Sequence, residues 1–279
     1  MGQETAGGKP AGGEPVGAAS PYLFPRHPRE VSRLDLQHYA LREALGADYL
    51  APIGEPARIL DVGAGSGQWG FDMLDAFPRA FVAGLDLVPG KPAANRRYRF
   101  VRGDVTTGLP FPEAHFDFVH QRLLRASLPV RAWPRAVAEL VRVTRAGGWI
   151  ELVELGNGLE PAGEATAELF RSLLRLASRQ GLDPDGHVVF ALDRLLAGAG
   201  LDDVATRRMN LPVGEWGGRP GSFLASDMRA MFTRLGPVFE SRLSIPAART
   251  VDLVRTAARE CEDLHSSALF YGAWGRRPG

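Results

Sequence analysis

Residues 57–155 alternate short apolar runs with segments of helical periodicity. The runs are 57–62, 80–86, 98–102, 116–121 and 149–155. Continuous apolar runs of this length are typical of strands that are buried on both faces of a parallel sheet. Trp133 and Pro134 open a helix that we expect to extend to about Val143. This alternation predicts βαβ units, with helices covering both faces of the sheet.

The second half of the chain has longer helical segments. We expect helices at 161–180, 188–199, 223–235 and 246–264, and strands at 204–211 and 268–274. Before the first strand, Leu34, Leu41 and Leu45 indicate a leading helix within 31–50. Together these elements predict an α/β fold with a Rossmann-like, doubly wound, mostly parallel sheet of seven strands.

A chain of 279 residues is long enough for one large domain. Residues 1–20 are rich in Gly, Ala, Pro and Glu, so we expect a disordered tail there. The domain then covers 21–279. Its predicted parts are the leading helix, the first half of the sheet at 56–156, a helical segment at 157–245, and a final helix and strand at 246–279.

Composition and charge limit the partners, the location and the metals that we expect for this chain. The net charge is +1 and the basic residues are spread along the chain, so no nucleic acid partner is predicted. No apolar run approaches about 20 residues, which predicts that the chain does not enter a membrane. Cys261 is the single cysteine and no secretory signal is visible, so we expect a cytoplasmic protein. The six histidines lack the spacing of metal ligands, and no metal is predicted.

The loop after the first strand carries the clearest chemistry. Gly63, Gly65 and Gly67 permit backbone dihedrals that cost other residues free energy, and they let a ligand approach the backbone closely. Asp61, directly before them, can accept loop amide hydrogen bonds or meet a cationic ligand group. Because ligands of a doubly wound sheet bind beyond the carboxyl ends of the strands, this loop predicts a binding site.

Glycine spacing alone allows two interpretations. Gly65 to Gly70 fits the dinucleotide fingerprint, and Asp86 follows at about the expected 20 residues, as in an NAD(P)-dependent oxidoreductase. Polar residues at further strand ends instead favour one adenosyl ligand. Asp86 would hold its ribose, Asp104 its adenine amino group, and the loop with Gln121 its methionine part. As alternatives, Asp104 could be a turn residue and Asp86 a cap of its own loop.

These motifs resemble the class I S-adenosylmethionine-dependent methyltransferases, and within them the LaeA-like methyltransferases of secondary metabolism. The similar segments are 33–39, 51–53, 59–69, 84–89, 116–122, 133–134, 147–155, 214–218 and 271–278. The chain lacks the Asp/Asn-Pro-Pro-Tyr/Phe tetrapeptide after the fourth strand, which would have suggested nitrogen methylation of bases or protein amides.

The resemblance implies S-adenosylmethionine as the cofactor and S-adenosylhomocysteine as the product. It implies that the leading helix closes over the cofactor and that a helical lid covers an acceptor pocket. The residues that it implies for cofactor binding are Gln37, Asp61, Gly63, Ala64, Gly65, Asp86, Leu87, Asp104, Val105 and Gln121.

Methyl transfer from a sulfonium chiefly needs a positioned acceptor, so a catalytic base is optional. We consider His120 first, because it ends the fourth strand near the expected crevice, and then His38 on the leading helix. Each could instead be a packed structural histidine. Glu154 could orient a donor, although capping of the next helix is the simpler interpretation.

The acceptor pocket is expected to be apolar. One stripe of the helix at 161–180 could form the pocket or the protein core. Its residues are Leu169, Phe170, Leu173, Leu174 and Ala177. Later apolar residues that could complete the pocket are Trp216, Phe223, Met228, Met231 and Phe232.

We therefore predict methyl transfer to a small molecule in a biosynthetic pathway, by a monomer or homodimer. The main alternative is a regulator that binds the cofactor without transferring its methyl group, or an enzyme that uses the bound sulfonium only for electrostatics.

Overall fold

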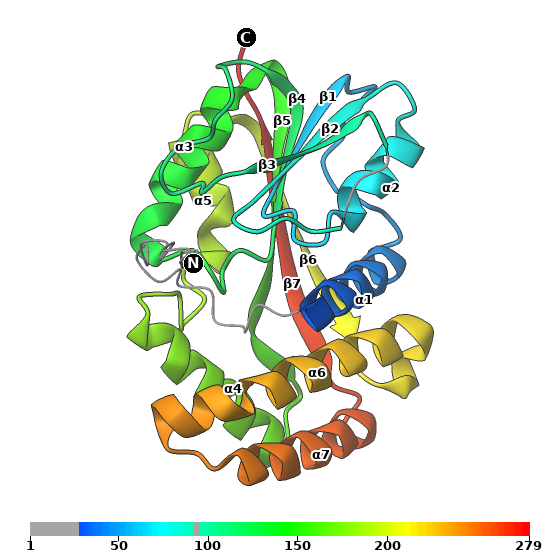
Figure 1. Ribbon diagram of the computed structural model, residues 1–279, viewed down its shortest axis with the longest axis vertical. Coiled ribbons are helices and arrows are strands. Elements are labelled where there is room, and N and C mark those ends of the chain that lie inside the picture. Colours follow the sequence, from blue (N-terminus) through cyan, green and yellow to red (C-terminus); the bar gives the residue numbers. More distant parts are fainter. Residues whose placement is uncertain (1–27, 92–94) are drawn as a thin grey trace, which may run out of the picture.

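The computed structural model describes residues 28–91 and 95–279, so the predicted tail at 1–20 lies outside the described residues (Figure 1). Seven strands form one sheet. They are β1 (Arg58–Val62), β2 (Phe81–Asp86), β3 (Tyr98–Arg102), β4 (Phe116–Arg122), β5 (Thr144–Glu160), β6 (Asp202–Pro212) and β7 (Ser267–Arg276). The predicted bounds of the first four strands agree with these to within one residue at each end.

The strand order is β3-β2-β1-β4-β5-β7-β6. The first five strands are parallel to one another. β7 is the exception, because it pairs antiparallel with both β5 and β6. The predicted fold class, a doubly wound and mostly parallel sheet of seven strands, is confirmed.

Seven α-helices accompany the sheet in the described part of the chain. They are α1 (Pro28–Leu45), α2 (Gln68–Ala76), α3 (Trp133–Val143), α4 (Glu164–Arg179), α5 (Leu192–Gly198), α6 (Gly218–Leu243) and α7 (Ala247–Asp263). Short 3₁₀ turns stand at Val130–Ala132, Val189–Ala191 and Glu215–Gly217.

Helices cover the two faces of the sheet separately. α3 and α5 pack on one face, where Leu60 belongs to the same apolar cluster as Trp133 and Leu192. α2 packs on the other face, where the neighbouring residue Ile59 contacts the cluster of Trp69. Successive strand residues point to opposite faces, so the continuous apolar run of β1 supplies both clusters.

A second helical layer lies at the far end of the long strands. β5, β7 and β6 extend beyond the rest of the sheet toward α4, α6 and α7, with α1 beside α6 (Figure 1). The core of this layer joins helix residues such as Phe170, Phe232 and Phe239 to Val153 and Phe270 of the strands. It forms one wall of the cavity described below.

Two elements, β5 and α6, are much longer than the sequence predicts. β5 continues past Leu155 because it still pairs with β7, through Leu159 opposite Ala268. α6 continues past Pro237, although proline removes a helical hydrogen bond. Phe239 lies beyond this proline and is fully buried in the helical core. Burial of this last stretch offsets the lost hydrogen bond.

Among the described residues, we find no helix that combines the length and the apolar character needed to span a membrane.

Candidate active site

A cavity of about 910 Å³ opens at the carboxyl ends of β1 to β5. It lies where the strand order reverses between β1 and β4, the place at which open α/β sheets bind ligands. All the predicted cofactor-binding residues except Gln121 line it. These are Gln37, Asp61, Gly63, Ala64, Gly65, Asp86, Leu87, Asp104 and Val105.

The glycine loop after β1 is held against β2. The amides of Gly63 and Ala64 donate to the carbonyl of Leu85, at 2.8 and 3.0 Å. Gly63 has a φ of +77°, a left-handed conformation that other residues rarely adopt. A Cβ atom there would also lie 2.5 Å from Leu124 Cδ2. Conformation and space both explain why glycine stands at this position.

Asp86 has a structural contact as well as a cavity position. Its Oδ2 accepts a hydrogen bond from the Gly65 amide at 2.9 Å, and its Oδ1 accepts one from Val88 at 3.2 Å. Burial raises the pKa of this carboxyl group, although the amides of Gly65, Val88 and Leu87 oppose the shift. Asp86 therefore joins the two loops and still presents its carboxylate to the cavity.

Asp104 forms the turn that was considered as an alternative to ligand binding. Its Oδ1 accepts hydrogen bonds from the amide and the hydroxyl of Thr106, at 2.8 and 2.7 Å. Because Asp104 also lines the cavity, the two interpretations are compatible. The turn holds the Asp104 side chain in place at the edge of the cavity.

His120 does not line the cavity. Its ring stacks on Trp69, with the ring centroids 3.9 Å apart, and its Nδ1 lies 3.2 Å from Asp61 Oδ1. Nε2 lies 3.8 Å from Oε1 of the buried Glu151. His120 is 1% exposed, so it is placed to orient Asp61 and not to contact an acceptor. This corrects the expectation that it faces the crevice as a base.

Gln121 is also outside the cavity. It pairs with Val62 of β1 and points to the face of the sheet that α3 covers. It is completely buried, and neither amide atom has a hydrogen-bond partner among the described residues. The structure therefore places Gln121 in the core beneath the loop, against the expectation that it contacts the methionine part of the cofactor.

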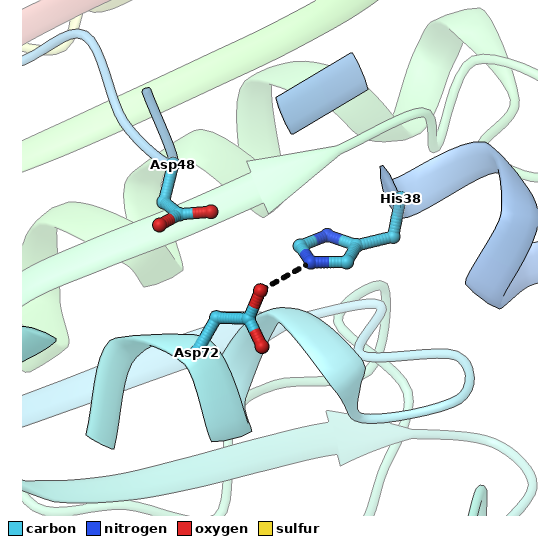
Figure 2. A group of neighbouring side chains, drawn as sticks. All are labelled: His38, Asp48 and Asp72. Carbon is cyan, nitrogen blue, oxygen red and sulfur yellow. Dashed lines mark hydrogen bonds and ion pairs between the residues drawn. The ribbon is translucent and has the colours of Figure 1, made fainter. Parts of the chain in front are cut away.

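His38 lines the cavity but is already engaged. Its Nε2 lies 2.9 Å from Asp72 Oδ2. A carboxylate oxygen of Asp48 lies within 4.8 Å of both side chains (Figure 2). Arg122 Nη2 lies 3.1 Å from His38 Nδ1. Burial tends to raise the pKa of Asp72, but hydrogen bonds from His38 and Gln68 outweigh it and lower the pKa.

The acidic groups around His38 are compensated by arginine. Arg42 contacts both carboxylates, through Nη1 to Asp72 at 2.5 Å and through Nε to Asp48 at 3.2 Å. Although the three side chains of Figure 2 lie close enough to share a cation, two guanidinium groups already occupy their surroundings. We interpret the group as an ionic network that joins α1 to α2.

A second buried network joins α1 to α6. Asp227 of α6 accepts from Arg33 at 2.7 Å and from Gln37 at 3.0 Å. Arg33 also donates to Glu30 of its own helix, and Glu30 accepts from Arg234. These bonds hold α1 over the cavity, which Leu34 and Gln37 line. No local sequence pattern indicates the role of Asp227, because its partners are nearly 200 residues away.

Glu154 of β5 is a buried carboxyl group that lines the cavity, as does the buried Asp183. The oxygens of Glu154 accept backbone hydrogen bonds from Leu124 at 2.8 Å and Arg125 at 3.2 Å. It therefore caps the loop after β4, not the following helix as expected. Burial raises the pKa of Glu154 to about 8, and the two amide donors only partly oppose this.

The part of the cavity beside α4 is mostly apolar. The wall that α4 contributes consists of Phe170, Leu173, Leu174 and Ala177, so most of the predicted stripe faces the cavity. Leu169 packs in the helical core instead. Of the later residues proposed for the pocket, Met231 alone belongs to the described lining. Trp216 is 38% exposed and contacts His265 outside it.

Comparison with known proteins adds to this geometry. A methyltransferase domain model matches residues 59–148. The chain is 33% identical to methyltransferase pytC of Aspergillus terreus over 211 residues, which are 71% of this chain and 63% of pytC. It is 31% identical to secondary metabolism regulator LAE1 of Cochliobolus heterostrophus over 215 residues, which are 71% of this chain and 68% of that protein.

The chain belongs to the class I S-adenosylmethionine-dependent methyltransferase family. This decides between the two interpretations of the glycine spacing, in favour of the adenosyl ligand. A Haemonchus contortus phosphoethanolamine N-methyltransferase in complex with S-adenosylmethionine shares the fold, with a TM-score of 0.50 and 14% identity over 89% of this chain and 52% of that one. The chain spans less than two thirds of the length of pytC.

The cavity fits the cofactor of this family. Gly63 and Gly65 line the cavity at the loop after β1, and both have a positive φ, of +77° and +54°. Asp86 and Asp104 present acceptors at neighbouring strand ends, suited to ribose hydroxyls and to the adenine amino group. A space of about 910 Å³ is large enough for a ligand of this size together with a second small molecule.

Proposed function

We propose that this methyltransferase moves a methyl group from S-adenosylmethionine to a small molecule with a largely apolar body, in secondary metabolism. One observation supports this most directly. The same cavity that begins at the glycine loop continues between α1, α4 and α6, where its lining is mostly apolar. Small-molecule sites commonly combine such a lining with few polar groups.

The chain's own residues would act mainly by positioning. Bound S-adenosylmethionine supplies a methyl group on a positively charged sulfur, which needs no further activation. Asp86 and Asp104 would hold its nucleoside part, and the loop at Gly63 would lie against its methionine part. Phe170 and Leu173 would hold the acceptor and exclude water. Orientation of this kind can supply a large part of the rate enhancement.

Glu154 is the titratable group best placed for an acceptor that loses a proton. It lies in the acceptor part of the cavity, whereas His120 lies outside the lining and His38 is bonded to Asp72 and Arg122. Its pKa of about 8 is close to the range that suits general base catalysis at neutral pH.

The first test is binding. Calorimetric titration should show that S-adenosylhomocysteine binds and that NAD does not. Asp86→Ala should weaken the binding by about 1–3 kcal/mol, because a ribose held by this carboxylate loses its acceptor. Unchanged affinity of this variant would remove Asp86 from the site.

The second test is transfer. Incubation with methyl-labelled S-adenosylmethionine and a small-molecule extract should yield a labelled organic product. Leu173→Asp should abolish this product and leave S-adenosylhomocysteine binding unchanged, because it places a charge only in the apolar part of the cavity.

The relative LAE1 is named a regulator, which keeps a regulatory function open as the second candidate. Cofactor binding without any labelled small product would favour that function and contradict the proposal.

A further inference from the structure

Arg122 is a cavity residue that the sequence analysis did not single out. It is the last residue of β4 and lines the cavity. The residue before it, Gln121, pairs with Val62, the last residue of β1, so Arg122 lies next to the glycine loop that follows β1. Its Nη2 is hydrogen-bonded to Nδ1 of His38 at 3.1 Å. Among the described residues, none of the carboxylates comes within 4.0 Å of its guanidinium nitrogens, and the side chain is largely but not completely buried.

The bond to His38 fixes the state of that histidine. A guanidinium group can only donate, so Nδ1 of His38 must be the acceptor. The ring hydrogen is then on Nε2, which donates to Asp72 at 2.9 Å (Figure 2). His38 in this state is neutral, so it orients Arg122 without neutralising its charge. Asp72 has its own cation in Arg42.

Other carboxylates lie farther away and explain how the site tolerates a buried cation. Burial lowers the pKa of Arg122, while the charges of Asp61, Asp48, Glu151 and Asp72 oppose this. Asp61 lines the cavity on the neighbouring strand, and one of its oxygens is bonded to His120. The β4 side of the cavity therefore presents a fixed cation next to a fixed carboxylate.

The cavity has hydrogen-bond acceptors at one end and a cation at the other, which suits a nucleoside that carries an amino acid. Asp86 and Asp104 provide acceptors at the ends of β2 and β3, and Arg122 provides donors at the end of β4. β2 and β4 are separated by two strand spacings, about 10 Å. A ribose that carries a methionine chain spans a similar length and ends in a carboxylate beside an ammonium group.

We propose that Arg122, oriented by His38, binds the α-carboxylate of the methionine part of the cofactor, an inference that rests on the proposed cofactor site. Arginine suits this role because its planar fork can pair with both carboxylate oxygens. His38 is then a positioning residue of α1, and binding at Arg122 couples that helix to the cofactor.

The test compares two ligands that differ only in the carboxylate. S-adenosylhomocysteine and its decarboxylated analogue, which keeps the amine, are titrated calorimetrically into the full chain. The wild type should bind S-adenosylhomocysteine about 10- to 100-fold more tightly, the usual effect of a charge-assisted pair. In Arg122→Met this preference should fall below about threefold, and Arg122→Lys should keep part of it.

Three further variants separate this role from a merely structural one. Asp86→Ala should weaken both ligands equally, because both contain the ribose. Arg255→Met changes an exposed arginine of α7 and should alter neither affinity. His38→Leu should reduce the preference for the carboxylate, and His38→Asn should restore part of it, because the amide oxygen can accept from Arg122.

Two results would overturn the inference and leave the proposed function intact. One is a wild type that binds both ligands equally. The other is Arg122→Met with an undiminished preference for the carboxylate, which would assign Arg122 to the acceptor. A wild type that binds neither ligand would overturn the proposed function, and this inference with it.

Discussion

Three consecutive residues at the end of β4 lie in three different environments. His120 stacks on Trp69 behind the cavity, Gln121 is buried in the core on the opposite face, and Arg122 lines the cavity. Their chemistry alone does not distinguish these positions, since all three are polar and adjacent. The direction of each side chain and the helix packed above it determine which one can meet a ligand.

Glu154 should make the stability of the protein depend on pH. A glutamate ionises near pH 4.3 in an unfolded chain, whereas the pKa of Glu154 is about 8. Between these values the native state keeps a proton that the unfolded state has lost, so the free energy of unfolding falls as the pH rises. Glu154→Gln cannot ionise, and its stability relative to wild type should increase by up to about 1.4 kcal/mol per pH unit.

Urea unfolding of both proteins at several pH values between about 5 and 9 measures this difference. Glutamine retains one acceptor for the two amides, which adds a constant offset and leaves the slope unaffected. A difference that stays constant with pH would show that Glu154 is ionised in the native state throughout.

Gln121 should be replaceable without loss of cofactor binding. Its two amide atoms are buried without a partner among the described residues, so Gln121→Met should raise the free energy of unfolding by about 1 kcal/mol. Thr144→Val is the matched control, since the Thr144 hydroxyl donates to Leu140 at 2.7 Å and its loss should be destabilising. Weaker S-adenosylhomocysteine binding by Gln121→Met would return Gln121 to the site.

At the scale of elements, the position of α1 depends on buried charges of α6. Asp227→Ala removes the partner of Arg33 and Gln37 and should cost about 2–4 kcal/mol of stability, since Arg33 keeps Glu30. It should also increase hydrogen exchange in α1 and weaken cofactor binding. Asp252→Ala, which breaks an exposed pair with Arg255, should cost less than about 1 kcal/mol.

Equal effects of the Asp227 and Asp252 substitutions on stability would contradict the role of Asp227. So would faster hydrogen exchange spread evenly over the chain, because the two networks around α1 predict a local change.

For the whole molecule, β7 is the element that completes the sheet. It is the last strand of the chain, yet it inserts between β5 and β6 and pairs antiparallel with both. A chain that ends after Leu264 should therefore lose cooperative thermal unfolding, because β6 and the long end of β5 lose their partner. A chain that ends after Arg277 keeps β7 and should unfold like the full protein. A cooperative transition in the shorter chain would contradict this.

The sequence predicted the first half of the molecule well for a physical reason. Strands β1 to β4 are short apolar runs bounded by polar residues, so their limits follow from local hydrophobicity. Parallel strands place their carboxyl ends at one edge, which is why Asp61, Asp86 and Asp104 could be expected together. The lengths of β5 and α6 could not be predicted, because pairing with β7 and burial of Phe239 extend them.

The sequence by itself thus determined the strands of the sheet, the glycine loop and the carboxylates at the strand ends. Each of these follows from a local pattern: apolar runs, closely spaced glycines, and acidic residues directly after an apolar run. The tertiary structure alone decided that His120 and Gln121 lie outside the lining and that Arg122 lies within it. A strand that is buried on both faces has apolar residues on both, so its sequence pattern does not show which face borders the cavity and which borders the core. That choice depends on the helices that pack on the two faces, α2 on one and α3 on the other.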